Sequence, residues 1–189
     1  RVNMDSKNVS RTQPWTGGAL YVDFTRSATL PTNATSELDA KFTELGYLSE
    51  DGITLSNDAD TNTVSAWGGD LVDNSTSNKT ETAEFTLIEQ KDDVFKLVYS
   101  PNAVTTNEAG ETVINDSGWN DESYPFVADT VLKNGRRKRF IFMQGAITGL
   151  GDESMNNSDV TGYDVTLSFT KTNGVFKRIF VQPSVSEES

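Results

Sequence analysis

The chain has 189 residues, a formal charge of −12 and 35% hydrophobic residues, which suits one domain with an ordinary core. It contains neither cysteine nor histidine, so disulfides, thiolate nucleophiles, Ser-His-Asp triads and the commonest transition-metal ligand are excluded. The acidic excess disfavours tight binding to nucleic acid, which normally needs clustered Lys and Arg. No apolar run approaches the ~20 residues that cross a bilayer, so we expect no membrane insertion.

The two ends of the chain are polar and flank a single predicted domain. Residues 1–18 contain a proline and a glycine pair, which predicts an N-terminal arm, and residues 183–189 predict a solvated tail. Residues 19–182 predict the domain itself. Its first element is the stretch ALYVDFT, in which apolar and polar residues alternate as in a half-buried strand.

The next element is predicted to be a helix over SELDAKFTELG, residues 36–46. Leu38, Phe42 and Leu45 lie at i, i+4 and i+7, which places them on one helical stripe. Gly46 is a suitable residue just after a helix C-terminus. We therefore expect this helix to pack on a sheet.

A long loop is predicted over residues 46–80, because this stretch is acidic and poor in large apolar residues. Structureless loops of this length are uncommon in compact domains and are usually functional or disordered. Trp67 stands in the middle of the stretch and is followed by Gly68 and Gly69. A tryptophan in such a loop is either the loop's own anchor or an interface hot spot.

The remaining chain predicts antiparallel hairpins. TAEFTLIE and VFKLVY are predicted to pair across a turn at residues 90–93. PFVADTVLK pairs with RRKRFIFMQ around Asn134-Gly135, and DVTLSFTK and VFKRIFV flank Asn173-Gly174, a dipeptide that strongly favours hairpins. A second loop, residues 105–123, is predicted with Trp119 as its anchor. The sum is a mainly β fold: an antiparallel β-sandwich or open barrel with one flanking α-helix.

The acidic motifs predict neither catalysis nor a metal site. Asp58, Asp60 and Asn62 match three positions of a calcium-binding loop, but Thr63 and Gly69 stand where a glycine and a bidentate glutamate are required. Paired carboxylates of the glycosidase type are not singled out by any spacing among so many acids. We expect no enzyme activity, no cofactor and no metal.

The basic run RRKR, residues 136–139, has two interpretations. Charged residues often line an exposed edge strand and block unwanted pairing. Alternatively, Arg136, Arg137 and Arg139 form a cationic face that meets the acidic surface of another copy, since charge complementarity sets register between partners. The sequence leaves both interpretations open.

The order of these features resembles the major tail tube proteins of long, non-contractile-tailed bacteriophages. The resemblance spans roughly Ala19 to Phe169 and rests on the stretches SELDAKFTELGYLSEDGI, WGGD, TAEFTLIE, FKLVYS, RRKRFIF, GAITG and GYDVTLSF. It implies a β-sandwich with a flanking helix that forms hexameric rings, which stack into a tube. It also implies that the long loop reaches neighbouring subunits and rings, through the candidate contact residues Tyr47, Trp67, Gly68, Gly69 and Asp70.

The resemblance implies a location and partners as well. The protein would be synthesised in the host bacterial cytoplasm and built into the virion, where it contacts other copies of itself and the tape measure, tail tip and terminator proteins. Double-stranded DNA would pass through the lumen without tight binding, because an acidic wall repels it. The alternative is a carbohydrate-binding β-sandwich module on a virion or cell surface, which the Asp, Glu, Trp and Tyr side chains would suit.

Overall fold

The computed structural model describes residues 9–15, 19–153, 155–158 and 160–183. The residues of the predicted arm at 1–8 and 16–18, and those of the predicted tail at 184–189, lie outside the described residues. The elements are β1 (Thr12–Pro14), β2 (Leu20–Val22), β3 (Thr43–Glu44), β4 (Thr54–Ser65), β5 (Leu71–Leu87), α1 (Asp92–Tyr99), β6 (Val104–Thr106), β7 (Thr112–Ile114), β8 (Tyr124–Leu132), β9 (Arg137–Leu150), β10 (Tyr163–Phe169) and β11 (Lys177–Val181).

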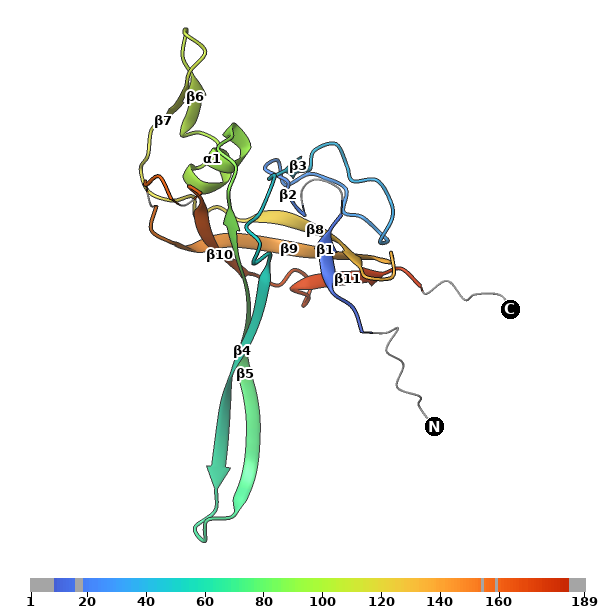
Figure 1. Ribbon diagram of the computed structural model, residues 1–189. Coiled ribbons are helices and arrows are strands. Elements are labelled where there is room, and N and C mark those ends of the chain that lie inside the picture. The colour runs from blue at the N-terminus through green and yellow to red at the C-terminus, as the bar shows by residue number, and fades with distance from the viewer. Residues whose placement is uncertain (1–8, 16–18, 154, 159, 184–189) are drawn as a thin grey trace, which may run out of the picture.

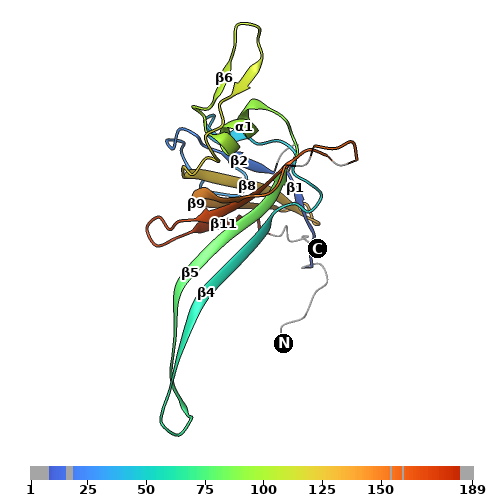
Figure 2. The same cartoon turned by 90° about the vertical axis from the view of Figure 1, so that its left-hand side faces the viewer.

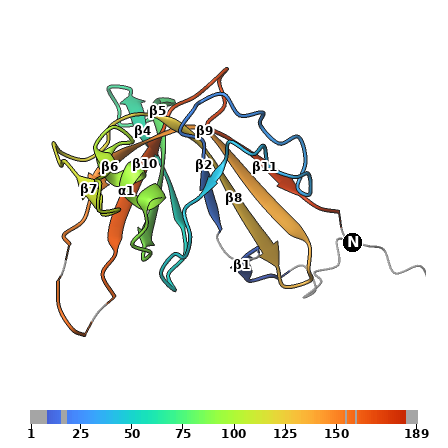
Figure 3. The same ribbon diagram turned by 90° about the horizontal axis from the view of Figure 1, so that it is seen from above.

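Most strands join one open antiparallel sheet in the order β3-β2-β8-β9-β10-β5-β4. β1 also pairs with β8, and β11 with β9, whereas β6 and β7 form a separate small sheet. Seen from above, α1 lies on the side of β10, whereas β11 lies beyond β8 and β9 on the side away from α1 (Figure 3). The prediction of a mainly β, antiparallel, sandwich-like fold is confirmed, and the sheet does not close into a barrel.

The central strands β8 and β9 are buried on both faces. Phe126 and Phe142 point into the larger hydrophobic cluster, which also contains the apolar side of α1. Val127 and Ile141 point the other way, into a second cluster covered by the segment between β2 and β3, including Phe42. Because successive side chains of a strand face opposite sides, one pair of strands supports both layers.

The predicted helix over residues 36–46 does not form. Leu38 and Phe42 pack in the second cluster, whereas Leu45 packs in the larger one, so the three side chains do not share one face. The carbonyl of Ser36 accepts a hydrogen bond from an arginine side chain of β9, not from a helical N–H. The i, i+4, i+7 spacing here reflects a chain that wraps around the sheet.

The helix lies instead at α1, where the strand VFKLVY was predicted. Val94, Leu97 and Val98 are buried at i, i+3 and i+4, and two aspartates stand in the first turn, where negative charge stabilises a helix. Pro101 follows the helix and disfavours its continuation. The predicted hairpin across residues 90–93 is therefore wrong. In the described part of the chain, no helix is long and apolar enough to cross a bilayer.

The segment predicted as a long loop is a β-hairpin. β4 pairs with β5 from Thr54 opposite Glu84 to Ser65 opposite Leu71, with two irregularities in register. Only the inner part of β5, from Thr82, also pairs with β10. The outer part, residues 58–80, is here named the arm, and it projects away from the body (Figures 1 and 2). At about 3.3 Å per residue it extends roughly 25 Å.

The two Asn-Gly turns behave differently. Gly135, with φ of +79°, closes the hairpin between β8 and β9 as predicted. The turn at Asn173 and Gly174 also forms, but β10 and β11 do not pair with each other. Both pair with β9, at different points along its length. A turn signal therefore marked the change of direction correctly without indicating the partner strand.

The predicted second loop, residues 105–123, contains the end of β6 and all of β7. Trp119 is 51% exposed and does not anchor it. The buried residue is its neighbour Asn120, whose N–H donates to the carbonyl of Val98 at 2.7 Å and whose side chain donates to the Tyr124 hydroxyl. A polar side chain with satisfied hydrogen bonds thus fixes this segment against α1.

Candidate assembly surfaces

The tip of the arm is a tight turn that contains Trp67, Gly68, Gly69 and Asp70. The N–H of Ala66 donates to the carbonyl of Asp70 at 2.8 Å, and the N–H of Gly69 donates back to Ala66 at 2.9 Å. Gly69 has φ of +91°, which favours glycine there. The Trp67 side chain is fully exposed, so it anchors nothing within its own protomer.

Three other exposed apolar residues stand near Trp67 along the paired strands of the arm. Val64, Leu71 and Val72 are each about half exposed; with Trp67 they are named the tip cluster. The rest of the arm is polar, rich in Asn, Ser, Thr and Asp. Because contiguous exposed apolar side chains mark interaction sites in soluble proteins, the tip cluster is a candidate contact surface.

Tyr47 lies far from the tip, where the arm joins the body. Its N–H donates to the Glu89 carboxylate at 2.7 Å, and this hydrogen bond lowers the pKa of Glu89 from its ordinary value of 4.5. Gly46 has φ of +80°, and a Cβ there would lie 2.3 Å from the Glu89 carboxyl carbon. Gly46 is thus required by this junction, not by a helix end. The structure does not bring Tyr47 and Trp67 together.

A groove of about 510 Å³ lies on the body, and it is bounded by β1, the segment 47–53 and one face of β8 and β9. Its floor includes Leu55, Phe140 and Phe142. Leu55 and Phe140 pack against the larger core cluster but are only partly buried. The larger core is therefore left partly open at this end of the sheet.

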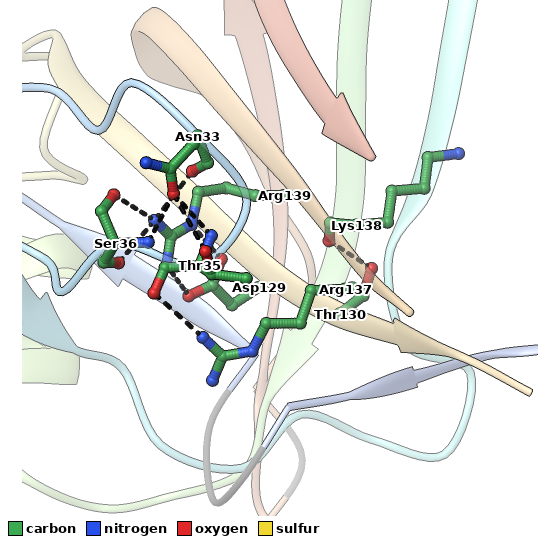
Figure 4. Close-up of polar contacts among 8 residues, drawn as sticks. All are labelled: Asn33, Thr35, Ser36, Asp129, Thr130, Arg137, Lys138 and Arg139. Atoms are coloured by element: carbon green, nitrogen blue, oxygen red, sulfur yellow. Dashed lines mark hydrogen bonds and ion pairs between the residues drawn. The ribbon is translucent and has the colours of Figure 1, made fainter. Parts of the chain in front are cut away.

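Arg139 is 2% exposed and lies inside the protomer. Its guanidinium donates two hydrogen bonds to the Asp129 carboxylate, at 2.5 and 2.7 Å, and one to the carbonyl of Ser36 at 2.8 Å (Figure 4). It ties the sheet to the segment between β2 and β3. The expectation that Arg139 belongs to an exposed cationic face is wrong, because the protomer itself neutralises and buries it.

The other basic residues of the run each contact a different part of the protomer. The Arg137 guanidinium lies 3.6 Å from the centre of the Trp15 ring, and Arg136 Nε donates to the Gln182 carbonyl at 2.7 Å. Lys138 points away from Arg139 (Figure 4). Its ammonium group lies 4.9 Å from the centre of the Phe140 ring. The edge-strand interpretation is wrong too, since this part of β9 pairs with β8 on one side and β11 on the other.

Among the residues that the structure describes, no group of three or more His, Cys, Asp or Glu side chains could hold a metal ion. Asp58 and Asp60, which resemble part of a calcium loop in sequence, lie on β4. The Asp60 carboxylate accepts a hydrogen bond from the Asn78 side chain at 2.7 Å across the arm. Both aspartates therefore lie in the paired strands of the arm, where Asp58 is opposite Thr80 and Asp60 is opposite Ser77.

The described residues define an open antiparallel β protein with a projecting hairpin and a grooved body. A family model described as phage tail tube protein matches residues 17–180, most of the chain. The chain therefore belongs to the phage tail tube protein family, and the resemblance inferred from the sequence is confirmed. Membership indicates a structural role in the tail tube of a phage virion. No curated protein matches the chain.

Proposed function

We propose that the protein forms hexameric rings that stack into the tail tube of a long, non-contractile-tailed phage, through which the genome enters the host. The family match is the observation that carries this proposal. The arm supports the stacking step, because it extends beyond the body and ends in the exposed tip cluster. An element that buries nothing in its own protomer gains its stability from contact with another chain.

The open sheet supports the closure of rings. β3 ends the strand order at one side and β4 at the other, so among the described residues neither has a further partner strand along its outer edge. Such edges are an aggregation hazard unless they are covered or paired. Lateral contact between protomers would cover these two edges and would convert separate open sheets into a continuous wall.

The charge of the chain supports a conduit for DNA. At −12 per protomer, a tube repels double-stranded DNA and allows it to slide without tight binding. The ends and interior of such a tube would meet the remaining proposed partners: the tape measure, tail tip and terminator proteins. Synthesis in the host bacterial cytoplasm precedes incorporation into the virion.

Negative-stain electron microscopy over a concentration series tests the proposal. We expect rings at low concentration and hollow tubes of uniform diameter at high concentration. A variant whose arm is shortened, with Asn-Gly in place of residues 59–79, should form no tubes. Dispersed protomers at every concentration would contradict self-assembly of the chain. Sugar-dependent quenching of tryptophan fluorescence would then favour the carbohydrate-binding alternative.

A further inference from the structure

The groove on the body exposes apolar surface that the described chain leaves uncovered. Leu48, Ile53, Leu55 and Phe140 line it and are only partly buried. Its volume of about 510 Å³ lies in the range of sites that bury large apolar groups. A site of this size and chemistry needs an apolar occupant.

The apolar floor continues across β11. Ile179 is directly opposite Phe140 in the strand pairing, so both side chains lie on the same face. Val181 is similarly opposite Lys138. Ile179 and Val181 are 45% and 44% exposed. Lys138 therefore borders this apolar surface, and among the described residues no carboxylate forms an ion pair with it.

The tip cluster matches this surface in chemistry. It combines a fully exposed tryptophan with three exposed aliphatic side chains, and the acidic Asp70 and Asp73 stand beside them. The chain segments outside the described residues match it less well: RVNMDSKN at residues 1–8, TGG at 16–18 and SVSEES at 184–189 carry few large apolar side chains. The tip cluster also supplies negative charge for Lys138.

The tip of a protomer does not reach the groove of the same protomer. Leu55 lies in the groove at the start of β4, and the paired strands then lead away from it for the length of the arm. At about 3.3 Å per residue, the chain from Leu55 to Trp67 spans up to roughly 40 Å. Figures 1 and 2 show the arm leaving the body in one direction.

We infer that the groove is the docking site for the arm tip of a second copy of this chain. Trp67 enters the apolar groove, and Asp70 and Asp73 approach Lys138 at the end away from the acidic rim formed by Glu50 and Asp51. The contact joins different surfaces on the two copies, so it propagates head to tail and does not close a dimer. The inference rests on the proposed function and names the partner surface for ring stacking.

Cross-linking between two single-cysteine variants tests this contact, because the chain has no cysteine of its own. Gly68→Cys places a thiol at the tip, where a Cβ meets nothing within 4 Å. Gln13→Cys places one on β1 at the groove. The two variants are mixed and treated with a short bis-maleimide, and we expect a covalent dimer only in the mixture. Gly68→Cys mixed with Glu108→Cys, in the β6–β7 turn, is the matched negative control.

Adding Trp67→Ala to the Gly68→Cys variant measures how much the Trp67 side chain contributes to the contact between the two copies. A buried tryptophan hot spot contributes enough that its loss should lower cross-linking about 30-fold at subsaturating concentration. Trp119→Ala removes another exposed tryptophan, on the body, and should leave the yield unchanged. Equal losses in the two variants would overturn the role of Trp67.

Electron microscopy of the same samples separates this inference from the proposed function. Specific cross-links with tubes support both. Specific cross-links without tubes support the docking site and contradict ring stacking. Tubes without specific cross-links leave the tail tube role intact and overturn the docking site. Absence of both overturns the docking site as well, as does a cross-link yield that persists in the Trp67→Ala variant.

Discussion

Arg139 shows how one charged side chain can be structural. It lies between β8 and the segment that precedes β3, with its charge opposed by Asp129 and its remaining donors on backbone carbonyls. Pairs of this kind repay their desolvation only when the geometry is good and the other donors are satisfied. Both conditions hold here, so the pair joins β8 and β9 to the segment between β2 and β3 that covers one face of the sheet.

We predict that Arg139→Met destabilises the protomer by about 3 kcal/mol, because it leaves Asp129 as an unpaired buried charge. Urea unfolding of unassembled protein measures the loss. Arg136→Met is the matched control, since the Arg136 side chain donates one hydrogen bond at a partly exposed position, and it should cost less than about 1 kcal/mol. Adding Asp129→Leu to Arg139→Met should restore part of the stability. Equal effects of the two single substitutions would contradict the account.

Gly46 and Gly52 both have positive φ, but their surroundings differ. Alanine at Gly52 meets nothing within 4 Å, whereas alanine at Gly46 collides with the Glu89 carboxylate. We predict that Gly52→Ala costs about 1–2 kcal/mol from backbone strain alone. Gly46→Ala should cost about 1 kcal/mol more, since Glu89 must move and release the N–H of Tyr47. Thermal unfolding of the two variants distinguishes them, and equal losses would show that Glu89 adapts freely.

At the scale of elements, the arm and the body are separable. Nearly all arm residues are exposed and pair only with each other. Isolated two-stranded hairpins are marginally stable in water. The inner part of the same hairpin is held by β10 and by the larger core cluster, so the body supports the arm but does not depend on it.

We predict that replacing residues 59–79 by Asn-Gly changes the stability of the body by less than about 0.5 kcal/mol. The new two-residue turn would join Asp58 to Thr80, which already pair, and Asn-Gly suits that geometry. Circular dichroism with urea unfolding measures the effect. A large loss of stability would show that the arm contributes to the protomer and would weaken the case that it serves assembly.

The predicted helix over residues 36–46 and the predicted strand over residues 94–99 were wrong for a common reason. Residues 36–46 and 94–99 both carry apolar side chains at spacings compatible with more than one structure. In the first, the apolar side chains belong to two different clusters on opposite sides of the sheet. In the second, three of them face one cluster, and acidic residues precede them. The arrangement of the sheet decided which stretch became helical.

At the scale of the whole molecule, the protomer is incomplete in two ways. Its sheet is open, with β3 and β4 at the ends of the strand order, and its apolar tip and apolar groove lie on different parts of the surface. Both features suit a protein that is completed by copies of itself, as expected of a family that builds tubes. The net charge of −12 also opposes nonspecific association between protomers.

The sequence by itself determined the mainly β class, the family and the Asn134-Gly135 hairpin, because these depend on local alternation and turn chemistry. It also singled out Trp67. Only the tertiary structure decided that residues 58–80 form a projecting hairpin, that Arg139 is buried, and that Asn120 anchors its segment. A local pattern shows that a side chain needs a partner, but only the packed fold determines which partner it meets, because those partners come from distant parts of the chain.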